Sequence, residues 1–277
     1  MSSTPNIMDP ALARSMLFVP GDRPERFGKA VASGADAVIL DLEDAVAPAS
    51  KCRARDAIAD FLQRGGQAML RINGLDHKSI NDDLALCGLP GVTGIVYPKA
   101  ESSTQLQWVR SRMRSGVALM PLIETAVGLR DVHQVAATPG VTRLLFGHLD
   151  FCLDLGLEPG DDEAELAAYR STLVLASRAC GLHPPVDGVT VNVHDSEELS
   201  RAALAARRCG FGGKLCIHPA QVSKVNAAFS ASSNDLAWAR RVMDAAEGQP
   251  GAFLLDGQMV DAPVLGKAQR LLAGVAR

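Results

Sequence analysis

The chain has 277 residues, of which 47% are hydrophobic and 21% charged, a composition typical of soluble α/β proteins rather than disordered or fibrous chains. Its 28 Lys and Arg residues nearly balance its 31 Asp and Glu residues, so the formal net charge of −3 gives no reason to expect a nucleic acid or an anionic membrane as a partner. No stretch approaches the ~20 apolar residues of a membrane span and the N-terminus lacks a secretory pattern, so we expect a cytoplasmic protein.

The six cysteines form no CxxC pair and show no spacing typical of metal ligands. Most of them fall inside predicted helices or strands. We therefore expect reduced, structural thiols, as is usual in cytoplasmic proteins.

Residues 1–13 are expected to form a flexible tail, and residues 14–230 a catalytic domain in which strand and helix patterns alternate. Strands are expected at 15–20, 37–43, 68–73, 94–99, 118–124, 143–150, 185–191 and 213–218. Helices are expected at 23–34, 50–64, 79–87, 104–115, 125–137, 163–181, 196–209 and 220–229. Eight buried strands alternating with eight amphipathic helices predict a closed parallel (β/α)8 barrel, a fold that takes ~200–250 residues as one domain.

The pattern changes in residues 231–277. Helices are expected at 234–247 and 263–275, and between them an Asp-Gly pair at 256–257 favours a hairpin turn. This helix-hairpin-helix extension is too small to be an independent domain. We expect it to pack on the barrel or on a neighbouring subunit.

Polar residues close the predicted strands, which is typical of a barrel enzyme because all the chemistry of this fold lies at the carboxyl ends of the strands. These residues are Asp41, Glu43, Arg71, Asn73, Lys99, Glu124, Asp150 and His218. Side chains two apart on a strand point the same way, so His148 and Asp150 are predicted to share a face of strand 143–150.

Several carboxylates with no nearby His–Cys cluster favour Mg²⁺ over Zn²⁺, because Mg²⁺ is held by one or two protein carboxylates and keeps other positions for water and substrate. Glu124 and Asp150 are the candidate pair. The alternative is that these acids only cap the following helices. Arg71 is suited to grip a substrate carboxylate with two N–H groups, or it pairs structurally with Asp41 or Glu43.

A Gly/Pro loop at 20–29 follows the first strand and enters a helix whose first turns carry Arg23, Arg26 and Lys29. Backbone donors at a helix N-terminus together with basic side chains suit a phosphate or nucleotide tail. The alternative is a solvated basic helix face. For His148 and His218, contact with a ligand and structural hydrogen bonding both remain open.

Taken together, the motifs resemble the HpcH/HpaI aldolase superfamily, and within it the citrate lyase β-subunit-like branch that includes malyl-CoA and citramalyl-CoA lyases. The resemblance covers residues 14–273. The segments that carry it are RSMLFVPGDRPERFGKA, AVILDLEDAV with the Lys51/Arg55 pair after it, LRINGLD, VYPKAE, PLIETAVGL, FGHLD, GFGGKLCIHPAQV and DGQMVDAP.

The resemblance implies a carbon–carbon lyase that depends on Mg²⁺, with Mn²⁺ as an alternative, acts on 3-hydroxyacyl-CoA thioesters and assembles as a homotrimer or hexamer. It makes Glu124 and Asp150 the metal ligands and Arg71 the group that binds the 2-oxo acid. The family's thioester contacts fall at Phe18, Arg23 and Lys29, its acidic group around the metal ligands at Asp41, Glu43 and Asp44, and further substrate contacts are expected at Leu149 and His218. Asp261 matches an aspartate that family members donate to the active site of the adjacent subunit, where it acts as the base.

Two segments depart from the family pattern. His148 and Leu149 stand where many relatives have smaller residues, and residues 186–195 also differ. Both lie near the expected substrate mouth, so the identity of the substrate stays open. Two other functions stay open as well: the β subunit of a citrate lyase that uses an acyl-carrier-protein thioester, and a non-catalytic paralogue that binds oxo acids or CoA.

Overall fold

The structure is a computed structural model that describes residues 9–249 and 251–274. The chain divides into two compact units, one that ends at Asn226 and one that begins at Ala227. Of the predicted tail, residues 1–8 lie outside the described part, and Pro10–Leu12 form a short 3-10 helix. The predicted boundary after residue 230 stays a prediction.

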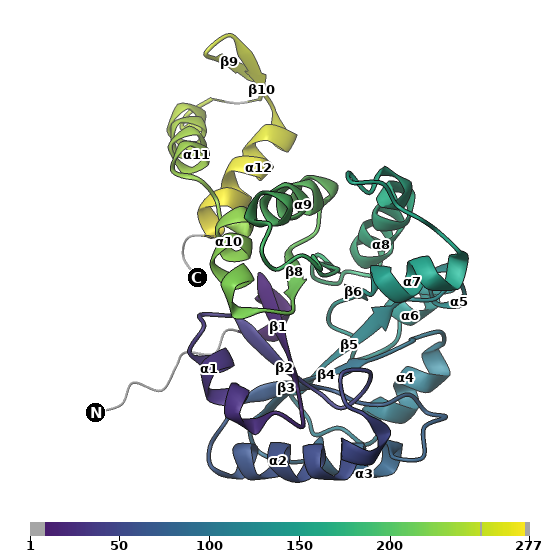
Figure 1. Cartoon of the computed structure of the whole chain (residues 1–277). Helices are drawn as coiled ribbons and strands as arrows, with labels where there is room; N and C mark the ends of the chain where they lie inside the picture. The colour runs from purple at the N-terminus through teal and green to yellow at the C-terminus, as the bar shows by residue number, and fades with distance from the viewer. Residues whose placement is uncertain (1–8, 250, 275–277) are drawn as a thin grey trace. The chain divides into compact units, whose positions relative to one another are not determined.

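Eight parallel strands close into a barrel in the first unit, in sequential order from β1 to β8 with β8 paired to β1 (Figure 1). The strands are β1 Ser15–Pro20, β2 Ala37–Asp41, β3 Ala68–Arg71, β4 Val92–Tyr97, β5 Ala118–Ile123, β6 Leu145–Phe146, β7 Val186–Asp187 and β8 Gly213–Cys216. The predicted (β/α)8 architecture is therefore confirmed.

Helices connect the strands on the outside of the barrel (Figure 1). They are α1 Phe27–Val31, α2 Lys51–Gln63, α3 Ile80–Leu86, α4 Ser103–Arg110, α5 Ala126–Arg130, α6 Val132–Ala136, α7 His148–Leu155, α8 Ala167–Ala179, α9 Ser196–Cys209 and α10 Pro219–Phe229. Further 3-10 helices span Pro24–Arg26, Pro48–Ser50 and Ala164–Leu166. No helix of the described residues is long and apolar enough to cross a membrane.

Apolar side chains from every strand fill the interior of the barrel. One buried cluster contains Met16, Ile39, Met69, Val96, Met120, Leu145, Val186 and Leu215, which come from β1 to β8 in turn. A barrel of this size is a packed core rather than a channel. Space for a ligand is found at its carboxyl end, above this layer.

The structure corrects two of the predicted strands. β6 ends at Phe146 and β7 at Asp187, well before the predicted ends at residues 150 and 191. His148 and Asp150 lie in the first turn of α7, so the prediction that they share a face of a strand is wrong. The sequence from 147 to 155 fits both strand and helix periods, and an acid in the first turn of a helix is favoured by the helix dipole.

The second unit contains α11 Ser233–Ala246, the antiparallel strands β9 Phe253–Leu255 and β10 Gln258–Val260, and α12 Ala262–Ala273. Asp256 and Gly257 have φ angles of 52° and 75°, as the two central residues of a tight hairpin turn require. The helix-hairpin-helix order is therefore as predicted. A small core formed by Ala239, Val242, Val260 and Ala268 holds the unit together.

Candidate active site

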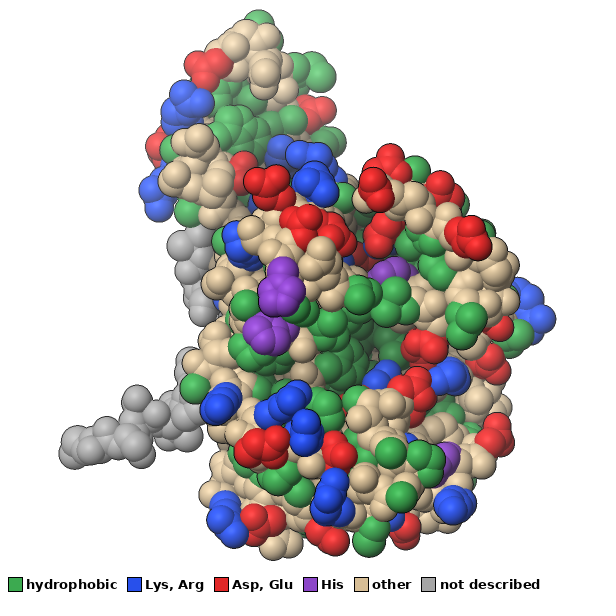
Figure 2. All heavy atoms as spheres, viewed as in Figure 1, with side chains coloured by type: hydrophobic (Ala, Val, Ile, Leu, Met, Phe, Trp, Pro, Cys, Tyr) green, Lys and Arg blue, Asp and Glu red, His purple; other side chains and the backbone are tan. Residues whose placement is uncertain are grey.

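A cavity of about 240 Å³ opens at the carboxyl end of the barrel. Its lining comprises Phe18, Asp41, Asp44, Ala45, Arg71, Leu122, Glu124, Phe146, Gly147, His148, Leu149, Asp150, Val189, Leu215 and Ile217. We call this cavity at the carboxyl end of the barrel the mouth. In Figure 2, hydrophobic side chains gather in the middle of the barrel unit and charged ones lie around them.

Arg71 is held on one side of the mouth by two carboxylates. Its Nε donates to Asp41 Oδ1 over 2.7 Å, its Nη2 donates to Asp41 Oδ2, and its Nη1 lies 3.0 Å from Glu43 Oε2. The contact with Asp41 follows from the parallel register, which places Asp41 beside Arg71 at the ends of β2 and β3. The guanidinium also lies 4.8 Å over the ring of Phe18. Three of the five N–H donors are used in this way, and two are left for a ligand.

Glu124 follows β5 and is 2% exposed. Its Oε1 accepts a hydrogen bond of 2.8 Å from the backbone N–H of Lys99. Burial, together with the negative charge of nearby Glu43, raises the pKa of Glu124 to about 8. Burial also raises the pKa of Glu43, against the opposing effect of Arg71 and Lys99. Both carboxyl groups are therefore easier to protonate than an exposed glutamate, chiefly because they are buried.

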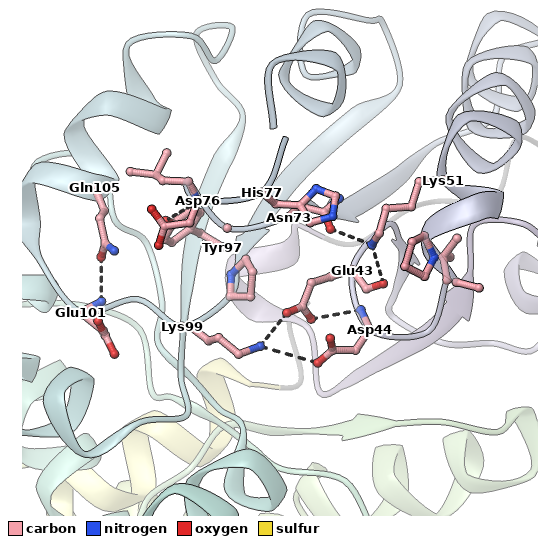
Figure 3. Close-up of a pocket in the computed structure, with 16 residues that line it drawn as sticks. Glu43, Asp44, Lys51, Asn73, Asp76, His77, Tyr97, Lys99, Glu101 and Gln105 are labelled. Atoms are coloured by element: carbon pink, nitrogen blue, oxygen red, sulfur yellow. Dashed lines mark hydrogen bonds and ion pairs between the residues drawn. The ribbon is translucent and has the colours of Figure 1, made fainter. Parts of the chain in front are cut away.

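A second cavity, of about 630 Å³, lies beside the mouth and shares Asp44 with it. Figure 3 shows Lys99 in its wall, with the ammonium directed towards Glu43 and Asp44. The other lining residues include Lys51, Asn73, Asp76, His77, Tyr97, Glu101 and Gln105. Asp44 therefore lies where the two cavities meet, and Glu43 and Lys99 line the second cavity beside it.

A buried group of hydrogen-bonded polar side chains lies beneath Glu43. Its structural role was not predicted from the sequence. Lys51 Nζ donates to the backbone oxygens of Leu42 and Glu43 over 2.7 and 3.0 Å, and to Asn73 Oδ1 over 2.7 Å. Asn73 Nδ2 also donates to the Leu42 oxygen. Together they hold the chain that follows β2 in place. The available signal was Lys51 itself, a lysine at the start of the helix that follows the acidic motif.

Replacing Lys51 with methionine is expected to lower the free energy of unfolding by about 2–3 kcal/mol, because it leaves buried carbonyl oxygens without a donor. Urea denaturation measures this change. The control is Arg53→Met on the same helix, whose exposed side chain lies 3.5 Å from Asp22 and whose loss should cost less than about 0.5 kcal/mol. If the two variants lost the same free energy of unfolding, the proposed stabilising role of the buried Lys51 contacts would be contradicted.

Glu124 and Asp150 are the two acids predicted to hold a cation together. Both line the mouth, and the charge of Asp150 is one of the causes that raise the pKa of Glu124. No group of three His, Cys, Asp or Glu residues suited to a metal ion occurs within residues 9–249 and 251–274. Two carboxylates with open space in front of them fit Mg²⁺, which takes its remaining oxygens from water and ligand.

Gly147 allows the chain before α7 to lie close to Glu124. A Cβ atom at this position would lie 2.5 Å from Glu124 Oε2, closer than any side chain can approach. The glycine therefore lets α7, which carries Asp150, begin directly against the Glu124 carboxylate. The donor set and the room around it fit a hard divalent cation.

His148 belongs to a buried network of charges as well as to the mouth. Its Nε2 lies 3.6 Å from Glu163 Oε1, Glu163 pairs with Arg170, and Arg170 and Lys214 both pair with Asp187. Burial lowers the pKa of His148 and favours the neutral ring. Structural contact is therefore established for His148, while contact with a ligand stays a prediction.

The structure brings some of the other predicted residues to the mouth and leaves others outside. Phe18, Asp44 and Leu149 line it. His218 does not, although its neighbour Ile217 does; its Nδ1 accepts a hydrogen bond from the backbone of Ala220. Arg23 and Lys29 are exposed and do not line the mouth either. Asp261 lies in the second unit, where it caps α12 by accepting a hydrogen bond from Val264.

Comparison with known proteins gives these features a family context. The model of the family described as HpcH/HpaI aldolase/citrate lyase matches residues 14–219. A citrate lyase subunit beta-like protein of Mycobacterium tuberculosis is 38% identical over 263 residues, which cover 92% of this chain and 93% of that protein. A (3S)-malyl-CoA thioesterase of Cereibacter sphaeroides is 34% identical over 269 residues, covering 94% and 93% of the two chains.

Among solved structures, the M. tuberculosis protein CitE in complex with magnesium, acetoacetate and coenzyme A superposes with a TM-score of 0.84 at 38% identity. The match covers 96% of this chain and all of that chain. Sequence motifs, barrel and overall likeness therefore agree, and the chain belongs to the HpcH/HpaI aldolase/citrate lyase family.

Proposed function

We propose that the protein is a Mg²⁺-dependent carbon–carbon lyase that cleaves a 3-hydroxyacyl-CoA, such as malyl-CoA or citramalyl-CoA, to acetyl-CoA and a 2-oxo acid, or catalyses the reverse condensation. The observation that carries the proposal is the mouth itself, in which a pair of carboxylates suited to a cation faces an arginine with spare N–H donors. The CitE structure with magnesium, acetoacetate and coenzyme A supports the same combination of ligands.

In this proposal Glu124 and Asp150 hold Mg²⁺, with Mn²⁺ as an alternative. When bound, the ion supplies positive charge that polarises the oxygens of the 2-oxo acid portion. The remaining N–H donors of Arg71 bind the carboxylate of that portion, while Asp41 and Glu43 fix the guanidinium in orientation.

The thioester portion lies over the apolar side of the mouth. Phe18 and Leu149 contact it there. Arg23, Lys29 and His218 lie outside the mouth, and we assign them to the longer CoA tail, whose phosphates suit basic side chains. Asp44, at the edge of the mouth, keeps the surroundings acidic together with Glu43.

In the cleavage direction a carboxylate, which we assign to Asp261 of an adjacent subunit, takes the proton of the substrate hydroxyl. The carbon–carbon bond then breaks, the hydroxyl carbon becomes the carbonyl of the 2-oxo acid, and the electron pair moves into the thioester as its enolate. Protonation of the enolate carbon gives acetyl-CoA. This assignment requires a homo-oligomer, which we propose to be a trimer or hexamer.

Sharing of Asp261 predicts complementation between two inactive proteins. Asp261→Asn protein and Glu124→Gln protein are each expected to lack activity, and asparagine keeps the helix cap. After they are unfolded and refolded together, about a quarter of the sites in random hybrids should combine an intact barrel with an intact Asp261. Assay of the mixture should therefore give roughly a quarter of wild-type activity. A mixture as inactive as its components, despite hybrid oligomers, would contradict the sharing of the site.

A second candidate is hydrolysis of the thioester, favoured by the relatives named (3S)-malyl-CoA thioesterase. The products separate the two reactions when the purified protein is given malyl-CoA. A lyase releases acetyl-CoA and glyoxylate, while a thioesterase releases malate and CoA with a free thiol. Free thiol without any oxo acid would overturn the lyase proposal.

Citrate lyase subunit beta of Leuconostoc mesenteroides, 30% identical over 280 residues, supports a carrier-protein thioester as an alternative substrate. Release of oxaloacetate from the citryl carrier protein, but of no oxo acid from CoA thioesters, would favour that reading. A non-catalytic paralogue would turn over neither.

A further inference from the structure

Lys99 lines the second cavity, where its ammonium points towards Glu43 and Asp44 (Figure 3), and it also lies near Glu124, which lines the mouth. Its ammonium lies 2.7 Å from Glu43 Oε1, 3.6 Å from Asp44 Oδ2 and 4.0 Å from Glu124 Oε1. Glu43 and Asp44 follow β2, whereas Glu124 follows β5. One cation therefore joins acids that follow two different strands and would otherwise repel each other.

The backbone of Lys99 is fixed in an unusual conformation at this point. Its φ angle of 45° lies in the left-handed region that residues other than glycine rarely adopt. In this conformation the backbone N–H donates to Glu124 Oε1, the same oxygen that lies nearest to the ammonium. The backbone contact is independent of the side chain. A substitution that removes the ammonium therefore tests the effect of its charge, while the backbone hydrogen bond from residue 99 to Glu124 remains.

Acidic side chains outnumber basic ones around the mouth and its edge. Asp41, Glu43, Asp44, Glu124 and Asp150 are five acids, against the cations of Arg71, Lys99 and Lys51, of which Lys51 is buried and bound to backbone oxygens. Arg71 is committed to Asp41 and Glu43, and its side chain is only 12% exposed. The Lys99 side chain is 46% exposed and ends in flexible methylene groups. Lys99 is therefore the cation that can move away from Glu124 when another cation approaches.

We propose that Lys99 is a built-in counter-ion of the metal site, a positioning residue that holds Glu43, Asp44 and Glu124 together in the metal-free protein and weakens Mg²⁺ binding by its positive charge. The inference rests on the proposed function, since it takes Glu124 as a metal ligand. Two cations near the same carboxylate repel each other, and solvent around the half-exposed ammonium reduces this repulsion without cancelling it. The metal must therefore displace the charge of Lys99 in order to bind.

Titration calorimetry with Mg²⁺ alone tests the proposal without any substrate. Lys99→Met is expected to bind Mg²⁺ about tenfold more tightly than the wild type, because the repulsion is removed. Lys99→Arg keeps the charge and should stay within about twofold of the wild type. The matched control is Lys224→Met, which removes an exposed lysine of α10, and it should leave the affinity unchanged.

Thermal unfolding gives a second readout. Lys99→Met should lower the Tm in EDTA, where the carboxylates lose their counter-ion, and the difference from wild type should shrink in saturating Mg²⁺. Affinity that is unchanged or weaker in Lys99→Met overturns the proposal, as does an equal loss of Tm with and without metal. A wild-type protein that shows no Mg²⁺ binding overturns the metal assignment of the proposed function as well, and this outcome is distinct because the wild-type titration itself is flat.

Discussion

Replacing Glu124 with glutamine is expected to lower kcat/KM for cleavage by about 10³-fold, the order of loss seen when one key group that stabilises transition-state charge is removed. Glutamine has nearly the same shape, and its oxygen can still accept the hydrogen bond that Lys99 donates to Glu124 Oε1. Because glutamine cannot ionise, the change removes the negative charge that Glu124 would present to a bound cation and little else. Kinetics at saturating Mg²⁺, together with the Mg²⁺ dissociation constant, measure the effect.

The control for this change is Glu158→Gln, an exposed acid in the loop after α7. It should leave kcat/KM within about twofold of wild type, because surface changes away from the site have small effects. If Glu124→Gln keeps both activity and Mg²⁺ affinity within the same range, Glu124 is not a metal ligand and the proposed site fails.

Replacing Arg71 with lysine is expected to lower kcat/KM by about 10²-fold or more, because one ammonium cannot reproduce the forked contacts of a guanidinium. In the condensing direction the loss should appear mainly as a higher KM for the 2-oxo acid. The free energy of unfolding should fall by about 2–3 kcal/mol, since Asp41 is 1% exposed and loses charged hydrogen bonds. Kinetics and urea denaturation measure the two effects separately.

Arg14→Lys is a matched control for this substitution. Arg14 forms a comparable forked pair with Asp36, through bonds of 2.7 and 2.9 Å, but it lies at the amino end of β1 and not at the mouth. Its replacement should lower stability while kcat/KM stays near wild type. If Arg71→Lys behaved in the same way, Arg71 would be a structural residue only.

The sequence predicted the barrel well, because buried strands and amphipathic helices have distinct periods and alternated eight times. Pairing of Arg71 with Asp41 or Glu43 was one of the two alternatives drawn from the sequence, and the structure shows both contacts, since Asp41 and Arg71 end neighbouring parallel strands. The errors arose in segments where the spacing of apolar residues fits a strand as well as a helix. After Phe146 the apolar pattern continues, but the chain turns into α7 at His148, and this places Asp150 on a helix instead of a strand.

The role of Lys99 could not be predicted in the same way. Its partners Glu43 and Glu124 lie far from it in the sequence, and its left-handed backbone has no sequence signal. The buried contacts of Lys51 likewise depend on where α2 crosses the end of β2. The role of Asp261 stays a prediction, because it depends on the assembly of subunits.

The most direct test of the central claim is cleavage of malyl-CoA, citramalyl-CoA and citryl-CoA by the purified protein, in Mg²⁺ and in EDTA. We expect release of glyoxylate, pyruvate or oxaloacetate from at least one thioester, together with acetyl-CoA, in Mg²⁺ only. Release of an oxo acid that continues unchanged in EDTA, or no release from any of the three by a folded protein that binds Mg²⁺, would contradict a Mg²⁺-dependent acyl-CoA lyase.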